Sequence, residues 1–332
     1  MALKIFKSGR EGIDATRTAA ATAMAHALEF DTAFWQQDVQ TIRPLRLTGS
    51  YEGYNTAAAG TETNTLEMSG VLSYDMALWL GQVFCKGAVT GVKGVGVDYL
   101  WTYLPTHTSD DLSSFSSQFG YSDGIGATAP VVTLKNLLGD SLAITFDKSG
   151  EGLVTYDAKF VTPNAAVQTT AFTGAAAAIG STYVASANTT AVTIDTTTIG
   201  TTADTYWSSL KWTLDNGFQN LYTLNNTTSA TATFRPGPVG WKLEGSRYYA
   251  NKTEWDCYIA KTPRKVRIKS VGPTIGSSTY YIQLDLYGVY TAMKNEEQND
   301  LGFQTFTLEG VYDTTATSSY IYLVDSGLLT IT

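Results

Sequence analysis

The sequence predicts an all-β protein with one or two short helices, built as two similar β domains in tandem. Three observations carry this prediction. Apolar and polar residues alternate in many short segments, turn sequences separate several of them, and a strand-like segment early in the chain resembles one late in it. The chain has 332 residues, which is enough for two ordinary cores or for one large β domain.

The N-terminal segment is rich in alanine, and alanine favours a helix. Its pattern favours extended backbone instead, because Met24, His26 and Leu28 alternate with alanine, which is the spacing of a strand. We therefore expect residues 1–22 to form an extended arm that leads into a strand. A helix at this place remains the competing prediction.

Several later segments alternate in the same way. They are S-L-A-I-T-F-D (141–147), S-L-K-W-T-L-D (209–215) and Y-Y-I-Q-L-D (280–285). The first is followed by K-S-G-E-G and then by L-V-T-Y-D-A-K-F-V, which predicts a hairpin. The second is followed by Asn216-Gly217, a pair that also predicts a hairpin turn.

Two stretches of the chain resemble each other. L-E-M-S-G-V-L-S-Y (66–74) can be laid over W-K-L-E-G-S-R-Y-Y (241–249), which brings Gly70 onto Gly245. L-E-G-V-Y (308–312) is a further similar stretch. Together these matches predict a duplicated β domain.

A helix is expected at about 74–84, directly after the first of these stretches. Met76, Leu80 and Val83 have helical spacing there, and Gly87 follows as a stop signal. The segment N-K-T-E-W-D-C-Y-I occupies the equivalent place in the second half, where it predicts a shorter or frayed helix.

The domain bounds follow from these patterns and from one change in composition. Residues 23–165 are expected to form the first β domain and residues 206–332 the second. Between them, residues 166–205 are almost wholly Thr, Ala, Gly, Ser and Val, which indicates a connection or a lightly built hairpin with V-T-I-D as its one convincing strand.

The composition restricts the kinds of partner. Charged residues make up 16% of the chain, against about a quarter in a typical protein, so the surface is expected to be largely neutral and polar. Such a surface suits a protein that packs against copies of itself. The net charge of −8 disfavours a surface that grips nucleic acid, although nucleic acid as a passing cargo remains compatible with it.

The sequence predicts neither a disulfide framework nor a membrane segment. Cys85 and Cys257 are far apart and are expected to be small apolar side chains. Lys4 and Lys7 are not followed by the apolar core of a signal peptide, and no segment has the length and apolarity of a membrane span. We expect a protein that is made in the cytoplasm.

The sequence predicts no enzyme, no metal and no cofactor. His26 and His107 have no cysteine or carboxylate at a ligand spacing, and no nucleophile motif is present. D-G-I-G-A-T-A-P (123–130) mimics part of a dinucleotide fingerprint but does not follow a buried strand. Paired carboxylates for glycoside cleavage stay open, because such partners need only be close in space.

One cluster of positive charge stands out, K-T-P-R-K-V-R-I-K (261–269). A strand here would place Lys265, Arg267 and Lys269 on one face and apolar residues on the other. The cations would then form either a solvated face or an electrostatic contact with an acidic neighbour.

The order of these features resembles the major tail protein, or tail tube protein, of long-tailed bacteriophages. The resemblance is carried by G-R-E-G-I-D-A-T-R-T-A, by W-Q-Q-D-V-Q-T-I-R-P-L-R and by L-E-M-S-G-V-L-S-Y-D-M-A-L-W-L-G-Q-V-F. W-T-Y-L-P, a Ser-rich loop and the G-E-G-L-V-T-Y turn follow in the same order. The resemblance covers about residues 8–165. It extends to the second half only through the similarity between the two halves of the chain.

The resemblance implies a fold and a function. Its tandem β-sandwich domains would join their strands into a continuous β-barrel when rings assemble, and stacked rings would form the hollow tail tube that delivers the genome. Two tandem domains imply a ring of three chains with pseudo-sixfold symmetry, with a ring of six as the alternative. The tape measure protein and the tail terminator or tip proteins would be partners, and phage DNA would pass without specific binding. The protein would be assembled in the host bacterial cytoplasm and reside in the virion tail.

The N-terminal arm and the long loops of that family reach the next subunit or ring. The candidate inter-subunit contacts are therefore the cations of the arm and of the basic cluster, namely Arg10, Arg17, Lys265, Arg267 and Lys269.

Two other functions compete with this expectation. The abundance of Tyr and Thr would suit a surface or secreted β-sandwich module that binds carbohydrate, although strands and subunit interfaces also favour aromatic residues. A hydrolase on a β scaffold ranks last, because the sequence shows no nucleophile or metal set.

Overall fold

A computed structural model describes residues 8–14, 26–42, 58–87, 89–94, 96–105, 112–120, 131–169, 183–223, 228–250, 252–298 and 301–326. In this part of the chain the protein is all-β, with two short α-helices, one π-helical turn and one 3₁₀ turn. The predicted fold class is therefore confirmed.

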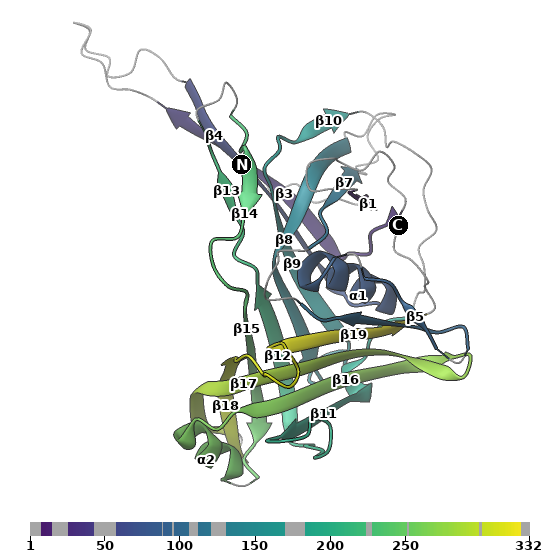
Figure 1. Cartoon of the computed structure of the whole chain (residues 1–332), viewed down its shortest axis with the longest axis vertical. Coiled ribbons are helices and arrows are strands. Elements are labelled where there is room, and N and C mark those ends of the chain that lie inside the picture. Colours follow the sequence, from purple (N-terminus) through teal and green to yellow (C-terminus); the bar gives the residue numbers. More distant parts are fainter. Residues whose placement is uncertain are drawn as a thin grey trace, which may run out of the picture.

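Eight antiparallel strands form the sheet that dominates the molecule, here called the large sheet (Figure 1). Their order across it is β3 (Thr32–Ile42), β4 (Ala58–Val71), β9 (Val154–Thr162), β8 (Val131–Asp147), β12 (Trp207–Asp215), β15 (Gly240–Tyr248), β18 (Leu301–Gly310) and β17 (Ser278–Gln298). The predicted segments around Ile144, Trp212 and Leu284 all lie in these strands, because alternation gives each of them one apolar face.

Two smaller sheets each include the first part of one long strand, β8 or β17. The N-terminal small sheet joins the first part of β8 to β7 (Phe115–Gly120), β10 (Val167–Thr169), β1 (Ser8–Ile13) and β2 (His26–Ala27). The C-terminal small sheet joins the first part of β17 to β16 (Arg264–Ile275), β11 (Thr190–Asp195), β19 (Tyr320–Ser326), β6 (Tyr99–Tyr103) and β5 (Val92–Lys93). A separate hairpin consists of β13 (Gln219–Leu221) and β14 (Ala232–Phe234).

Irregular residues lie where the two long strands pass from one sheet to the other. In β8 the register shifts between Gly139 and Ser141, close to Asn136, whose φ is 53°. In β17 it shifts between Tyr290 and Ala292. An extra residue bends a strand and increases its twist, so each long strand can belong to two sheets.

The same strand topology occurs twice in the described part of the chain. Six antiparallel pairings in the first repeat each have a counterpart in the second. Given with the first repeat before the second, they are β1–β7 and β11–β16, β3–β4 and β12–β15, β4–β9 and β15–β18, β7–β8 and β16–β17, β8–β9 and β17–β18, β8–β10 and β17–β19. A helix follows β4 in the first repeat and β15 in the second. The repeats start earlier than the expected domains, because β1 lies within residues 1–22 and β11 within residues 166–205.

The two helices occupy the expected positions. Helix α1 (Tyr74–Leu80) starts at Ser73, whose hydroxyl accepts a hydrogen bond from the Met76 amide, and it continues as a π-helical turn (Gly81–Cys85). Helix α2 (Thr253–Ala260) ends at Lys261 in the left-handed region. The 3₁₀ turn Ala187–Thr189 leads into β11, which contains the predicted V-T-I-D strand.

Most of the large aromatic side chains lie in one core that both repeats share. Helix α1 lies between the sheets, where Tyr74 packs on Tyr280 of the second repeat with 5.3 Å between ring centroids. Tyr103 packs in the same way on Tyr322, at 5.8 Å. Fully buried aromatics come from both halves of the chain, among them Trp101, Trp212, Tyr74, Tyr103, Tyr156, Tyr290, Tyr320, Tyr322, Phe84, Phe115, Phe119 and Phe160.

One of the two expected hairpins is present. Strands β8 and β9 pair across the K-S-G-E-G turn, which confirms that prediction. The prediction of a hairpin turn at Asn216-Gly217 is wrong, because the neighbours of β12 are β8 and β15. Asn216 is 1% exposed and its side chain bonds to other segments, so the chain leaves the sheet at this point toward β13.

Gly70 and Gly245 occupy equivalent positions in β4 and β15. A Cβ added to Gly70 would lie 2.9 Å from the Asp31 backbone nitrogen, and one added to Gly245 would lie 2.6 Å from the Ser209 backbone oxygen. Backbone cannot move aside as a flexible side chain does, so each site accepts glycine alone. The glycine that aligned the two halves in sequence therefore meets the same packing constraint in both.

Replacing either glycine is expected to lower the free energy of unfolding. Overpacking typically costs about 1–3 kcal/mol, so Gly70→Ala and Gly245→Ala should each lose an amount in this range in a urea titration. Gly240→Ala is the matched control, because a Cβ there meets no atom within 4 Å. Equal stability of all three variants would contradict the packing argument.

Candidate assembly surfaces

The described residues show no metal centre. Among them no group of three or more His, Cys, Asp and Glu side chains is placed to hold a metal ion. His26 lies in β2, whereas His107 and the segment 123–130 lie outside the described residues. In the same part of the chain, no helix has both the length and the apolarity needed to cross a membrane.

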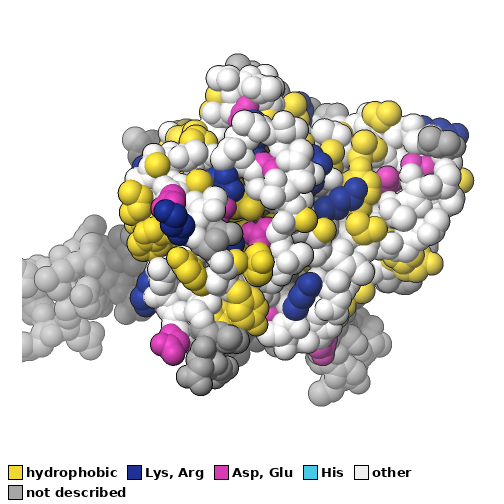
Figure 2. Space-filling model, turned by 90° about the horizontal axis from the view of Figure 1, so that it is seen from below, with side chains coloured by type: hydrophobic (Ala, Val, Ile, Leu, Met, Phe, Trp, Pro, Cys, Tyr) yellow, Lys and Arg dark blue, Asp and Glu magenta, His cyan; other side chains and the backbone are white. Residues whose placement is uncertain are grey.

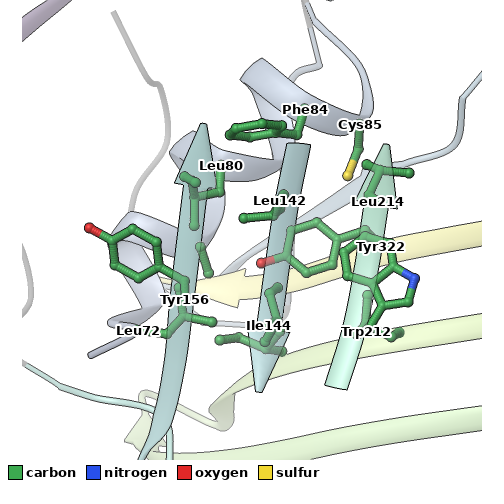
Figure 3. Packing of buried hydrophobic residues seen from close by; sticks show 14 of the residues in the cluster. Leu72, Leu80, Phe84, Cys85, Leu142, Ile144, Tyr156, Trp212, Leu214 and Tyr322 are labelled. Atoms are coloured by element: carbon green, nitrogen blue, oxygen red, sulfur yellow. The ribbon is translucent and has the colours of Figure 1, made fainter. Parts of the chain in front are cut away.

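The two repeats are joined edge to edge by the pairing of β8 with β12, here called the internal junction. Ile144 lies opposite Trp212 and Leu142 lies opposite Leu214, and all four side chains are buried. Figure 3 shows these four residues side by side on the core face, with Tyr322 packed against them. The rings of Trp212 and Tyr322 are stacked with 6.4 Å between centroids. The junction thus combines a hydrogen-bonded ladder with a large apolar contact.

Asn216 closes one end of the internal junction. Its side-chain amide donates to the carbonyl oxygens of Gly139 at 2.8 Å and Phe84 at 3.1 Å, and its backbone amide donates to Asp140 O at 2.8 Å. Arg235 donates to its side-chain oxygen at 3.2 Å. Asn216 therefore satisfies carbonyls beside the bulge in β8, and no motif in the sequence reveals this role.

We predict that Asn216→Ala destabilises the protein by about 1–3 kcal/mol. The substitution leaves the Gly139 and Phe84 carbonyls buried without their donor, and the cost of an unsatisfied buried polar group falls in this range. Chemical denaturation measures the loss, with Gln36→Ala as an exposed control on β3. Wild-type stability for Asn216→Ala would show that the carbonyls find other donors.

The large sheet ends in an open strand on each side. Within the described residues, β3 pairs with β4 alone, and residues 289–298 of β17 pair with β18 alone. Each strand therefore presents backbone N–H and C=O groups along its outer edge. An open edge of this kind is a template for pairing with another chain.

The solvent-facing side of the large sheet carries lysines and carboxylates in pairs. Its lysines lie opposite a carboxylate or two positions from one: Lys159 opposite Glu67, Lys211 opposite Glu244, Lys242 opposite Glu309, and Lys294 at 2.7 Å from Glu296. A hollow of about 270 Å³ crosses this side from β3 to β12. Further carboxylates lie on the same side, namely Asp38, Asp157 and Asp215, so carboxylates outnumber lysines there. Such a face does not attract a polyanion.

The basic cluster forms part of β16, as the alternation predicts. Val266 and Ile268 are buried, and Lys265, Arg267 and Lys269 lie on the other face. Figure 2 views the molecule from the end where α2 lies, and charges of both signs are interspersed there. The cations therefore do not form one separate basic patch on this end.

Each of these three cations has a partner in its own chain. Lys265 lies 2.7 Å from an Asp313 oxygen, and Arg267 donates to both oxygens of Asp285 at 2.7 and 2.8 Å. The ammonium of Lys269 lies 3.9 Å from the ring centroid of Tyr281.

The pKa values of these groups follow from the contacts. Hydrogen bonding to Asp285 raises the pKa of Arg267, and burial followed by the neighbouring guanidinium lowers the pKa of Lys269. The hydrogen bond from Lys265 holds the pKa of Asp313 below its usual range. Because these partners are intramolecular, contact with another subunit stays a prediction for all three cations.

Of the two candidate arginines in the N-terminal arm, Arg17 lies outside the described residues. Arg10 lies in β1, where its backbone is opposite Gln118 and Ala27 of the same chain. The carboxylate of Asp14, just after β1, accepts from Ser116 at 2.7 Å and from Asn136 at 3.1 Å. Residues 8–14 are thus built into the N-terminal small sheet of their own chain.

Glu11 in β1 is 1% exposed, and this burial raises the pKa of its carboxyl to about 8. The indole of Trp79 acts in the opposite direction, and Asp14 raises the pKa further. A raised pKa means that the folded protein keeps a proton that the unfolded chain has lost. Glu11 therefore stabilises the fold below its ordinary pKa of 4.5, and this contribution is lost as the pH rises through 8.

We predict that Glu11→Gln flattens this pH dependence. The free energy of unfolding of the wild type should fall, relative to that of Glu11→Gln, by up to about 1.4 kcal/mol per pH unit between the two pKa values. Urea titrations at pH 5 and pH 8 measure the difference, with Glu309→Gln as an exposed control. A constant difference between wild type and Glu11→Gln would mean that Glu11 is ionised in the fold.

Comparison with models of known protein families finds no match for this chain, and comparison with curated protein sequences finds none either.

Proposed function

We propose that the protein is the structural subunit of a hollow tube of the kind found in the tails of long-tailed bacteriophages. Copies close into a ring through the edges of the large sheet, and rings stack into the conduit for the genome. The observation that carries the proposal is a single sheet made of two equivalent halves, with an open strand at each end. The resemblance noted for residues 8–165 supports it independently of this topology.

The two open edges differ from each other, which favours a ring over a two-fold dimer. One edge belongs to β3 and the other to β17, so a contact between them is heterologous. Heterologous contacts that close by rotation give rings, and axial stacking of rings gives a tube. Closure also removes the edges that would otherwise promote irregular aggregation.

The strand count supports a ring of three chains. Each chain supplies eight strands to the large sheet, so three chains would close a barrel of 24. With the usual strand spacing and tilt, such a barrel measures roughly 50 Å between opposite backbones. Barrels of this width enclose an aqueous channel. The alternative ring of six chains would double the strand number.

The solvent-facing side of the large sheet is the natural lining of this channel, because the other side holds the core. The paired charges on that side leave little net attraction for phosphate, so DNA would pass without being held. Tape measure, terminator and tip proteins would contact the tube, and assembly would occur in the host bacterial cytoplasm before incorporation into the virion tail. No catalytic step is part of this function.

Negative-stain electron microscopy of the purified protein tests the proposal. We expect hollow tubes with a regular axial striation, because ring closure and stacking are properties of the chain itself. A protein that stays monomeric at high concentration and binds oligosaccharides would contradict the proposal.

A further inference from the structure

We infer that the start of β3 in one copy pairs antiparallel with the second part of β17 in the next copy, in the register that β12 and β8 adopt inside the chain. The inference rests on the proposed function and specifies its ring contact. It follows from the repeated topology, because each of the two strands has a counterpart at the internal junction.

The internal junction shows what the open edge of β17 accepts. Within the chain, β12 is the first large-sheet strand of the second repeat, and it lies on the outer edge of β8 from the first repeat. By the six matched pairings, β3 is the counterpart of β12 and β17 is the counterpart of β8. The outer edge of β17 lacks a β12-like strand within the described residues, and β3 lacks a β8-like neighbour.

The equivalent glycines determine which residues of β3 and β12 correspond. Met68, two residues before Gly70, lies opposite Ala33. Leu243, two residues before Gly245, lies opposite Trp212. Ala33 and Trp212 are therefore counterparts.

The same glycines relate β8 to β17. Gly70 lies opposite Tyr156, which lies opposite Ile144, whereas Gly245 lies opposite Phe306, which lies opposite Met293. Ile144 and Met293 are therefore counterparts. Because Ile144 lies opposite Trp212 in the internal junction, Met293 is expected opposite Ala33 of the next copy.

The faces of the two strands agree with this register. Ala33 is fully buried and Met293 packs against the core, so both belong to the core face. Their neighbours Phe34 and Ala292 lie on the other face, where the counterparts Thr213 and Ala143 are opposite each other in the internal junction. A slip of one residue would turn one strand's core side chains toward solvent, so this parity restricts the register.

Disulfide formation between copies tests the register. The test variant carries Phe34→Cys and Ala292→Cys. Cys257→Ser is added because Cys257 is partly exposed. We expect mild oxidation of assembled tubes to link most chains to a neighbour, seen as a ladder on a non-reducing gel. Ala143→Cys with Thr213→Cys is the positive control, since this observed pair should close within one chain without raising its mass.

A displaced pair provides the negative control. Phe34→Cys with Glu296→Cys moves one cysteine four residues along β17, about 13 Å, which is beyond the reach of a disulfide. Tubes that form without the expected link, or that link through position 296, would overturn the register but leave the proposed function standing. Absence of any tube or ring from the Cys257→Ser parent protein, with or without links, would overturn both.

Discussion

The continuous hydrogen-bonded ladder of the large sheet is the constraint on which the rest of the structure depends. A strand has two edges, and each must be paired, covered or exposed. In this chain six of the eight large-sheet strands have partners on both sides, and exposure is confined to β3 and to the end of β17. The two ends differ in sequence but are equivalent in topology to the strands that meet at the internal junction.

The side chains of the internal junction pack into the core that both repeats share. The buried faces of β8 and β12 meet Tyr322 from the C-terminal small sheet, and Tyr74 of α1 in the first repeat packs on Tyr280 of the second. Buried polar groups add hydrogen bonds, which have a preferred geometry, to these apolar contacts. Asn216 bonds the carbonyls beside the bulge in β8, and Glu254 binds Arg264 at 2.7 Å and accepts from the hydroxyl of Tyr290. The shared core therefore holds the two repeats at one relative orientation.

Alternation allowed much of the large sheet to be predicted, because strands with one buried face display it directly in their sequence. Leu142, Ile144, Trp212 and Leu214 are the clearest cases, and the glycine alignment located β4 and β15 in equivalent positions. The first helix also followed from periodicity, apart from its π-helical turn, and the second was expected from its equivalent place after β15.

Pairings between distant segments lay outside the reach of local patterns. Nothing in the N-terminal segment indicates that β1 pairs with β7, and Asn216-Gly217 has the form of a turn although Asn216 is used as a buried hydrogen-bonding group. The candidate cations Lys265, Arg267 and Lys269 were placed on the correct face of a strand, but their intramolecular partners come from β17 and from the loop that follows β18. Such partners depend on tertiary structure, which single-sequence patterns do not contain.

The rotational symmetry of one isolated ring tests the central claim most directly, because the claim is that each chain contributes two equivalent four-stranded units. Native mass spectrometry combined with an axial image average gives both the number of chains and the symmetry. The account predicts three chains with threefold symmetry and a pseudo-sixfold inner wall. A ring of six chains, or a closed two-fold dimer, would contradict it.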